Sequence, residues 1–185
     1  HRQLHIESSE IIVTRKIINT QFWAEKKVFV TGHTGFKGAW LSYWLGDLGA
    51  RVVGFSKYTD AQQKEFANSV EKLIDGSVVG DICCSHHLTN CLQRWQPEIV
   101  FHLAAQPIVR RSFTDVIETF ETNLMGTVNL LQAVRQTSSV QAVVIVTSDK
   151  CYKNLENGLS FNEDNPLGGD DPYSASKACA EIATN

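Results

Sequence analysis

Five side chains in the second half of the sequence have the types and spacing that proton transfer requires. Ser148, Asp149 and Lys150 directly follow the apolar run AVVIVT, and α/β proteins bind ligands where such strands end. Tyr173 and Lys177 form a YxxxK pair, and residues four apart share one face of a helix. The lysine charge would favour the phenolate form of Tyr173, which makes this tyrosine a candidate base for a hydroxyl group.

Three glycines at GxxGxxG spacing form a second motif. Gly32, Gly35 and Gly38 follow the β-branched run KVFVT and precede a run with helical apolar spacing. Residues without a Cβ let a pyrophosphate approach the backbone closely and rest on the first amide groups of the helix. A plain tight turn would need only one of these glycines, so the motif predicts dinucleotide binding.

The residues alone leave the choice between NAD and NADP open. NAD sites usually carry an acid about 20 residues past the glycine loop. The first acid here, Asp60, comes late, while Lys57 lies nearer the expected place. Asp81 ends the third predicted strand, where it would either hydrogen-bond the adenine or cap the next helix.

The elements that must position these groups alternate between strands and helices. Apolar and β-branched runs predict five strands, over residues 27–32, 51–56, 77–82, 98–105 and 142–148. Helical apolar spacing and turn signals predict helices over residues 36–50, 61–74, 86–96, 115–136 and 171–185. Because strands that alternate with helices pair in parallel, we predict a Rossmann-like, doubly wound α/β sheet with helices on both faces.

Composition and charge are typical of a soluble globular domain. Of 185 residues, 43% are hydrophobic and 20% are charged, and the net charge of −3 argues against a nucleic-acid surface. No apolar run approaches the roughly 18 residues that cross a bilayer, so we expect no membrane partner. Five cysteines without CxxC spacing, and histidines without a ligand pattern, predict a reduced cytoplasmic protein with no metal site. We assign residues 1–21 to an extension of unknown role and residues 22–185 to one dinucleotide-binding domain.

Several stretches of the sequence carry a family resemblance. They are FWAEKKVFVTGHTGFKGAWLSYWL (22–45), PEIVFHLAAQPIVRRSF (97–113), TFETNLMGTVNLLQAVRQT (119–137), VTSDKCY (146–152) and NPLGGDDPYSASKACAE (165–181). Together they resemble the extended short-chain dehydrogenase/reductase family, and within it the nucleotide-sugar 4,6-dehydratases. TGHTGFKG and TSDKCY are similar to the enzymes that act on CDP-glucose, whereas related dTDP-glucose enzymes place Glu where this chain has Lys150.

The resemblance implies an NAD-dependent dehydration with no net redox change. Tyr173, helped by Ser148, would take the proton of the sugar 4-hydroxyl while hydride passes from C4 to NAD. Lys150 would then remove the C5 proton, or stabilise the enolate charge as a cation, and Asp149 would protonate the departing 6-hydroxyl. The implied product is CDP-4-keto-6-deoxyglucose, an intermediate of deoxysugar and O-antigen lipopolysaccharide biosynthesis.

The resemblance also assigns the remaining site residues. The expected NAD-binding set comprises Gly32, Thr34, Gly35, Phe36, Lys37, Gly38, Asp81, Ile82, Leu103, Ala104, Ala105, Gln106, Asn123, Thr147, Tyr173 and Lys177. Gln106, Arg110 and Ser148 are expected to contact the nucleotide-sugar substrate, although Arg110 would equally suit a solvated surface. Asn123 would hold a bend in its helix, or make a local contact with backbone.

Members of this family are longer than this chain, and their C-terminal portion supplies the sugar-nucleotide pocket. We therefore expect the substrate region to be absent, so that the isolated chain binds cofactor but turns over substrate poorly. The resemblance also implies a homodimer or homotetramer. Two other functions stay open: a 4-epimerase or reductase, which needs no Asp149–Lys150 pair, and an inactive dinucleotide-binding module.

Overall fold

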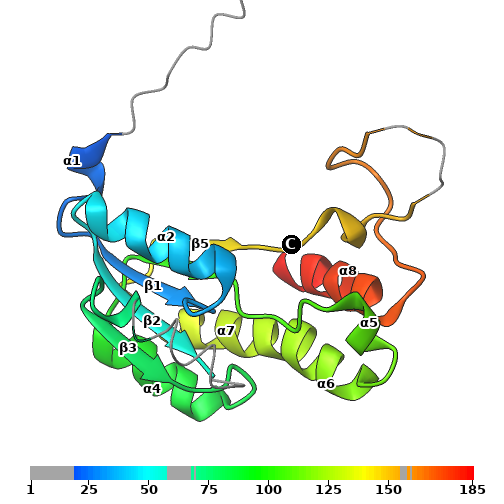
Figure 1. The fold of residues 1–185 in the computed structure, drawn as a ribbon, viewed down its shortest axis with the longest axis horizontal. Helices are drawn as coiled ribbons and strands as arrows, with labels where there is room; N and C mark the ends of the chain where they lie inside the picture. The colour runs from blue at the N-terminus through cyan, green and yellow to red at the C-terminus, as the bar shows by residue number, and fades with distance from the viewer. Residues whose placement is uncertain (1–18, 58–67, 69, 155–157, 159) are drawn as a thin grey trace, which may run out of the picture.

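Five parallel strands form one sheet in this protein, whose computed structural model describes residues 19–57, 68, 70–154, 158 and 160–185 (Figure 1). The strands are β1 (Lys27–Thr31), β2 (Arg51–Ser56), β3 (Gly76–Val79), β4 (Ile99–His102) and β5 (Ala142–Ile145). They lie in the order β3-β2-β1-β4-β5, and each pairing is parallel. The five predicted strands and the doubly wound topology are confirmed, but β3, β4 and β5 end at Val79, His102 and Ile145, before their predicted ends at residues 82, 105 and 148.

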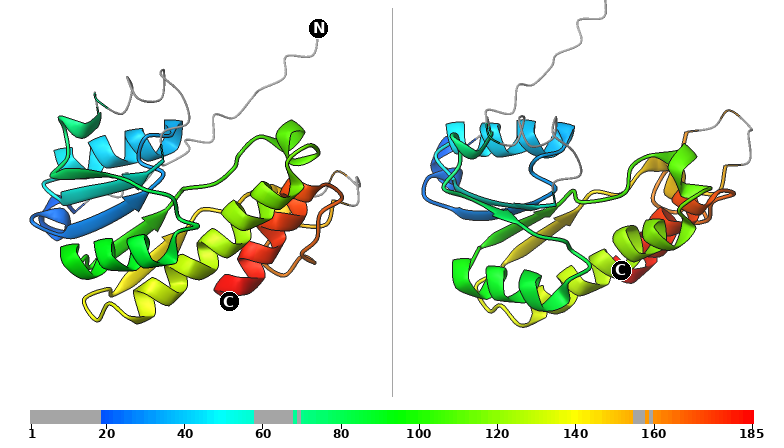
Figure 2. Two further views of the ribbon diagram at one scale, coloured as in Figure 1. Left: turned by 90° about the horizontal axis from the view of Figure 1, so that it is seen from below. Right: turned by 60° about the horizontal axis from the view of Figure 1, so that its bottom comes forward.

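Helices connect the strands and cover both faces of the sheet. They are α1 (Thr20–Trp23), α2 (Phe36–Asp47), α4 (Ser85–Trp95), α5 (Val109–Ser112), α6 (Val116–Phe120), α7 (Gly126–Arg135) and α8 (Pro172–Thr184). Figure 2 shows α2 on one side of the sheet and α4 with α7 on the other. The predicted helix at 61–74 lies largely, and residues 1–18 lie wholly, outside the described residues.

The chain changes direction across the sheet between β3 and β4. β1 is central because it pairs with β2 on one side and with β4 on the other, and Thr31 aligns with both Phe55 and His102. The loops that follow β1 and β4 therefore leave the same edge of the sheet next to each other. In open α/β sheets, ligands bind in the crevice at this position.

Alternating residues of the central strands point into two hydrophobic cores, one on each face. Phe29 packs in one core with Leu88 of α4 and Leu130 of α7. Val30 packs in the other core with Leu45 of α2. These side chains are all at most 2% exposed, and burial of each stabilises the fold by about 1.5–3 kcal/mol. The middle residues of β1 and β4 are all apolar because both of their faces are covered.

One helix differs from the sequence prediction. The expected single helix over 115–136 is divided into α6, a π-helical segment η1 (Glu121–Met125) and α7. Segments of this kind occur frequently at functional sites. β5 lies at the edge of the described sheet, and its Val144 is 45% exposed.

Candidate active site

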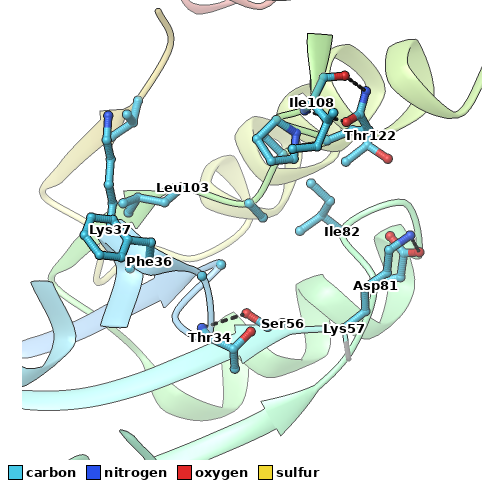
Figure 3. Close-up of a pocket in the computed structure, with 18 of the residues that line it drawn as sticks. Thr34, Phe36, Lys37, Ser56, Lys57, Asp81, Ile82, Leu103, Ile108 and Thr122 are labelled. Carbon is cyan, nitrogen blue, oxygen red and sulfur yellow. Dashed lines mark hydrogen bonds and ion pairs between the residues drawn. The ribbon is translucent and has the colours of Figure 1, made fainter. Parts of the chain in front are cut away.

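A cavity of about 540 Å³ opens at the edge of the sheet where β1 and β4 end (Figure 3). Its volume falls within the range of roughly 300–1,000 Å³ that small-molecule sites occupy. All of the predicted cofactor-binding residues line this cavity except Asn123. They reach it from the loops after β1, β3, β4 and β5, from the start of α2 and from α8, so the fold gathers residues that are far apart in the sequence.

The glycine loop approaches the rest of the site with its backbone alone. Gly32 has a φ of +73°, and a Cβ on it would come within 2.7 Å of the backbone nitrogen of Ala104. A Cβ on Gly38 would come within 2.1 Å of the carbonyl oxygen of Gly32. Gly35 is the N-cap of α2, so this helix presents its first amide groups beside the cavity. The loop therefore has the shape and the donors that a pyrophosphate needs.

His102 ties the end of β1 to the loop after β4. Its Nδ1 lies 2.6 Å from Thr31 Oγ1, and its Nε2 lies 3.1 Å from Thr127 Oγ1. Thr31 Oγ1 also accepts hydrogen bonds from the amides of Leu103 and Ala104, each at 3.2 Å. The Thr31 hydroxyl therefore donates its proton to His102 Nδ1, and the protonated Nε2 of the ring donates to Thr127 Oγ1. Burial lowers the pKa of His102 to about 3, so the ring is neutral at neutral pH.

Asn123 in η1 holds the loop after β4 without lining the cavity. Its Oδ1 accepts a hydrogen bond from the Gln106 amide at 2.8 Å. Its Nδ2 donates to the Gln106 carbonyl at 3.2 Å and to Ser176 Oγ at 2.9 Å. The side chain is only 2% exposed. Asn123 thus lies in the irregular part of the long helix and joins the loop after β4 to α8.

Tyr173 and Lys177 line the same cavity from the first turns of α8. Lys177 is 6% exposed, and its Nζ donates a hydrogen bond to the carbonyl of Val146 at 3.3 Å. Burial, together with the nearby charge of Lys37, lowers the pKa of Lys177 to about 8. The structure therefore places the YxxxK pair and the glycine loop around one space, with the lysine still protonated at neutral pH.

Ser148, Asp149 and Lys150 lie outside this cavity. Asp149 and Lys150 belong to a short 3-10 turn, η2 (Asp149–Cys151), which Ser148 caps by accepting a hydrogen bond from the Lys150 amide at 3.2 Å. The Ser148 hydroxyl donates to Asp149 Oδ1 at 3.1 Å. Asp149 and Lys150 line a separate pocket of about 180 Å³. The structure does not bring these two residues into one cavity with Tyr173.

Asp81 lies in the loop after β3 and lines the main cavity. Its Oδ1 accepts a hydrogen bond from the Cys83 amide at 2.9 Å, and its Oδ2 accepts one from Lys57 Nζ at 3.2 Å (Figure 3). The N-cap of α4 is Cys84. Asp81 is therefore not the helix cap that was one of its two predicted roles, and it faces a lysine instead.

The predicted set omits several residues that line the main cavity. They are Ser56, Lys57, Gly80, Pro107, Ile108, Arg111, Glu118, Thr122 and Val146. Arg110, the predicted substrate contact, is exposed and lines neither of the two pockets of the described residues, whereas its neighbour Arg111 lines the larger one. The sequence analysis notes Lys57 from its place directly after the second predicted strand, but does not include it in the cofactor-binding set. Glu118 could not have been found from the sequence, because α6 reaches the cavity only through the tertiary fold.

Neither a metal-binding cluster of side chains nor a membrane-spanning helix occurs in the described part of the chain. Within it, no group of three histidine, cysteine, aspartate or glutamate side chains could hold a metal ion. None of its helices is both long enough and apolar enough to cross a membrane. Asp60, the late acid of the sequence prediction, falls outside the described residues.

The sequence is similar to known nucleotide-sugar enzymes. The family model of GDP-mannose 4,6 dehydratase matches residues 29–185. CDP-glucose 4,6-dehydratase from Salmonella typhimurium is 49% identical over 171 residues, which cover 91% of this chain and 47% of that protein. dTDP-glucose 4,6-dehydratase from the same organism is 31% identical over 180 residues, which cover 84% of this chain and 48% of that protein. This chain spans about half the length of these curated relatives.

Solved structures agree with the fold. A double mutant of DesIV, a dTDP-glucose 4,6-dehydratase from Streptomyces venezuelae with NAD and DAU bound, aligns with a TM-score of 0.74 and 28% identity. The alignment covers 85% of this chain and 50% of that chain. MoeE5 in complex with UDP-glucose and NAD aligns with a TM-score of 0.69 and 30% identity, over 85% of this chain and 47% of that chain.

Proposed function

Because this chain belongs to the GDP-mannose 4,6 dehydratase family, we propose that it is a nucleotide-sugar 4,6-dehydratase that uses NAD and acts on CDP-glucose. The observation that carries the proposal is the single cavity that the glycine loop shares with Tyr173 and Lys177. The choice of CDP-glucose is supported by the 49% identity to the Salmonella enzyme of that name. The product would be CDP-4-keto-6-deoxyglucose.

The glycine loop fits the proposed cofactor. Neither Gly32 nor Gly38 has room for a larger residue, because a Cβ at either position would clash with neighbouring backbone. The backbone of the loop is therefore packed directly against the backbone around it. The open N-terminal turn of α2 supplies amide donors beside it. Bound NAD would supply the acceptor, and later the donor, of a hydride. Gly32, Gly35 and Gly38 would hold its pyrophosphate.

Tyr173 would take the proton of the sugar 4-hydroxyl. A protonated lysine on the same helix face favours the phenolate form of a tyrosine. Lys177 has this position and is buried, so its charge acts in a medium that screens it less than water does. The charge of Lys177 would therefore assist proton removal by Tyr173 while the lysine stays buried in the wall of the cavity.

Asp149 and Lys150 would carry out the elimination. Lys150 would remove the C5 proton, which a neighbouring ketone makes acidic, and Asp149 would protonate the leaving 6-hydroxyl. A second role for Lys150, as a cation that stabilises the enolate, uses the same position. Both side chains are exposed in the pocket next to the main cavity, so the sugar would have to extend toward η2 to meet them.

We also propose that the enzyme is a cytoplasmic homodimer or homotetramer. The five cysteines are all unpaired, as expected in a reducing compartment. Apolar side chains are exposed on the helices that would form the interface, including Ile117 at 76% on α6 and Ile182 at 62% on α8. Size-exclusion chromatography with light scattering would test the oligomeric state.

Turnover of CDP-glucose in the presence of a catalytic amount of NAD tests the function. The 4-keto product is detected by its absorbance in alkali, and NADH is followed in parallel. Product without net NADH would support an internal hydride transfer. Stoichiometric NADH with no keto-deoxy product would point to a dehydrogenase, and product only from UDP-glucose, dTDP-glucose or GDP-mannose would reject the assigned nucleotide.

An epimerase or reductase is the second candidate, because Tyr173 and Lys177 would serve it equally well. Its test is the same incubation, analysed for a changed sugar that has lost no water. Binding of NAD without turnover of any nucleotide sugar would leave the third candidate, a dinucleotide-binding module.

A further inference from the structure

The cavity carries charged side chains at the end of β2, where dinucleotide-binding folds recognise the adenosine ribose. In NAD sites a carboxylate about 20 residues past the glycine loop usually binds the ribose 2′-hydroxyl. β2 ends here at Ser56, whose Oγ accepts a hydrogen bond from the Thr34 amide at 3.4 Å, and Lys57 follows it (Figure 3). A hydroxyl and an ammonium therefore stand where an acid is usual.

Two carboxylates hold the ammonium of Lys57. Its Nζ donates a hydrogen bond to Asp81 Oδ2 at 3.2 Å and lies 3.6 Å from Glu118 Oε1. The three side chains are each between 36% and 41% exposed, and all three line the cavity. Burial alone would lower the pKa of Lys57, but Asp81 and Glu118 together raise it above its ordinary value. Lys57 is therefore charged, and its charge is compensated on two sides.

Arg111 extends this group of charges. Its guanidinium forms ion pairs with Asp115 and with Glu118, so Glu118 is shared by two cations. We refer to Lys57, Asp81, Arg111, Asp115 and Glu118 as the ribose-end cluster. Two cations and three carboxylates give the cluster a formal charge of −1 at neutral pH. A 2′-phosphate carries up to two negative charges, and the cluster offers it no uncompensated positive charge.

We propose that the ribose-end cluster makes this cavity prefer NAD to NADP, and that Glu118 enforces the preference by compensating Lys57. The inference rests on the proposed NAD-dependent function and adds the determinant that the usual acid would supply. An ammonium donates a hydrogen bond to a ribose hydroxyl as readily as a carboxylate accepts one. The same ammonium would bind a 2′-phosphate once a neighbouring carboxylate no longer opposes it.

Separate calorimetric titrations of the full chain with NAD⁺ and NADP⁺ test the proposal. The wild type should bind NAD⁺ more tightly. Glu118→Gln should shift the ratio of the two dissociation constants toward NADP⁺ by about tenfold, as expected for removal of one charge a few ångströms from a phosphate. Glu121→Gln removes the same charge one turn further along, outside the cluster, and should leave the ratio unchanged.

A second substitution keeps the test independent of how Glu118→Gln folds. Lys57→Glu puts an acid at the usual place and should weaken NADP⁺ at least tenfold more than it weakens NAD⁺. A ratio that neither Glu118→Gln nor Lys57→Glu changes would overturn the inference while leaving the proposed function intact. A wild type that prefers NADP⁺ would overturn the inference and the proposed use of NAD, but not the proposed dehydration. Binding of neither dinucleotide by the wild type would overturn the proposed function, and this inference with it.

Discussion

The glycine loop and the turn after β5 both follow parallel strands at one edge of the sheet, but different forces position them. β1 is central, and the loop that follows it meets neighbouring backbone at Gly32 and Gly38. β5 lies at the edge of the described sheet, and its turn exposes Asp149 and Lys150. The first region is fixed by packing and the second by the hydrogen bonds of Ser148.

These two regions would carry out different parts of the proposed reaction: cofactor binding and hydride transfer in the first, and elimination of water in the second. Residues for cofactor binding and for removal of the hydroxyl proton lie on buried elements, where a shift of the backbone would disturb the core. The residues proposed for the elimination, Asp149 and Lys150, lie on a short turn where both side chains are exposed, although Cys151 of the same turn is buried. Loops often carry chemistry on a rigid scaffold. Substitutions in the first region should therefore alter stability and binding together, and those in the second should alter one catalytic step.

The largest expected effects are on turnover, and they distinguish the hydride-transfer step from the elimination step. Tyr173→Phe removes the base and should lower turnover of CDP-glucose by about 10²–10⁴-fold, with no NADH formed. Lys150→Met should also block product formation but should still let NADH accumulate, because hydride transfer precedes loss of the C5 proton. Rapid-mixing absorbance would follow NADH, and the alkali assay would follow the keto sugar.

Lys153→Met is the matched control for Lys150→Met, because Lys153 is an exposed lysine three residues along the same loop. It should retain both steps. Complete dehydration by Lys150→Met would reject the elimination role of this lysine, and NADH formation by Tyr173→Phe at the wild-type rate would reject the role of the tyrosine.

The next effect tests whether backbone packing fixes the glycine loop. Gly32 and Gly158 have nearly the same φ, +73° and +72°, but a Cβ on Gly158 would meet no described atom within 4 Å. Alanine should lower the free energy of unfolding by about 1–2 kcal/mol at either position, through left-handed strain. Gly32→Ala should cost about 1–3 kcal/mol more, through overpacking against Ala104, and should abolish NAD binding.

Urea unfolding and NAD titration of both variants measure this difference. Equal losses of stability would mean that the loop relaxes freely around a new Cβ. The glycine loop would then resemble the turn after β5, and the comparison between the two regions would fail.

The sequence predicted what depends on short stretches of chain. Strand and helix periodicity is local, and parallel pairing follows from the alternation of strands with helices, so the sheet could be derived in advance. The glycine loop and the YxxxK pair are also contiguous motifs, and the fold places them around one cavity.

Features that depend on tertiary contacts could not be derived in this way. Glu118 approaches Lys57 from α6, 61 residues further along the chain, so no spacing rule connects them. The π-helical segment has ordinary helical periodicity in sequence, because one extra residue in a turn hardly disturbs it. The adjacency of Ser148, Asp149 and Lys150 to a strand end suggested a shared site with Tyr173, but the 3-10 turn directs two of them into another pocket.

A smaller effect tests how the buried region joins α8 to the sheet. Asn123→Ala removes three hydrogen bonds and leaves the Gln106 amide and carbonyl without their partner. The free energy of unfolding should fall by about 2–3 kcal/mol, since buried groups lose their partners. Asn129→Ala, on the same helical run, removes bonds to the Ile82 and Cys83 carbonyls nearer the surface and should cost less than about 1 kcal/mol.

Chemical unfolding of the two variants gives both numbers. Binding of NAD should weaken in Asn123→Ala, because both backbone groups of Gln106, which lines the cavity, lose their partner. It should weaken less in Asn129→Ala, which removes only one bond to the cavity residue Ile82. A loss of stability in Asn123→Ala no greater than in Asn129→Ala would show that the loop after β4 does not depend on this amide.

The smallest effect is a pH dependence that only the buried region should show. Burial lowers the pKa of His102 to about 3 and that of His33 to about 4, from 6.5. Below pH 6.5 these two histidines are protonated in the unfolded chain but stay neutral in the folded chain. The free energy of unfolding therefore falls as the pH drops from 6.5 toward the folded-state pKa values. One pH unit below 6.5, each histidine should cost about 1.4 kcal/mol.

Urea unfolding at about pH 7.5 and at about pH 5.5 measures this loss. His102→Asn should lose about 1.4 kcal/mol less than the wild type between the two values, whatever its stability at the higher pH. His86→Asn changes an exposed residue of α4 and should follow the wild type. If His102→Asn also followed the wild type, the ring would be accepting a proton in the folded state. The hydrogen bonds from Thr31 and to Thr127 would then not fix the end of β1 as the comparison requires.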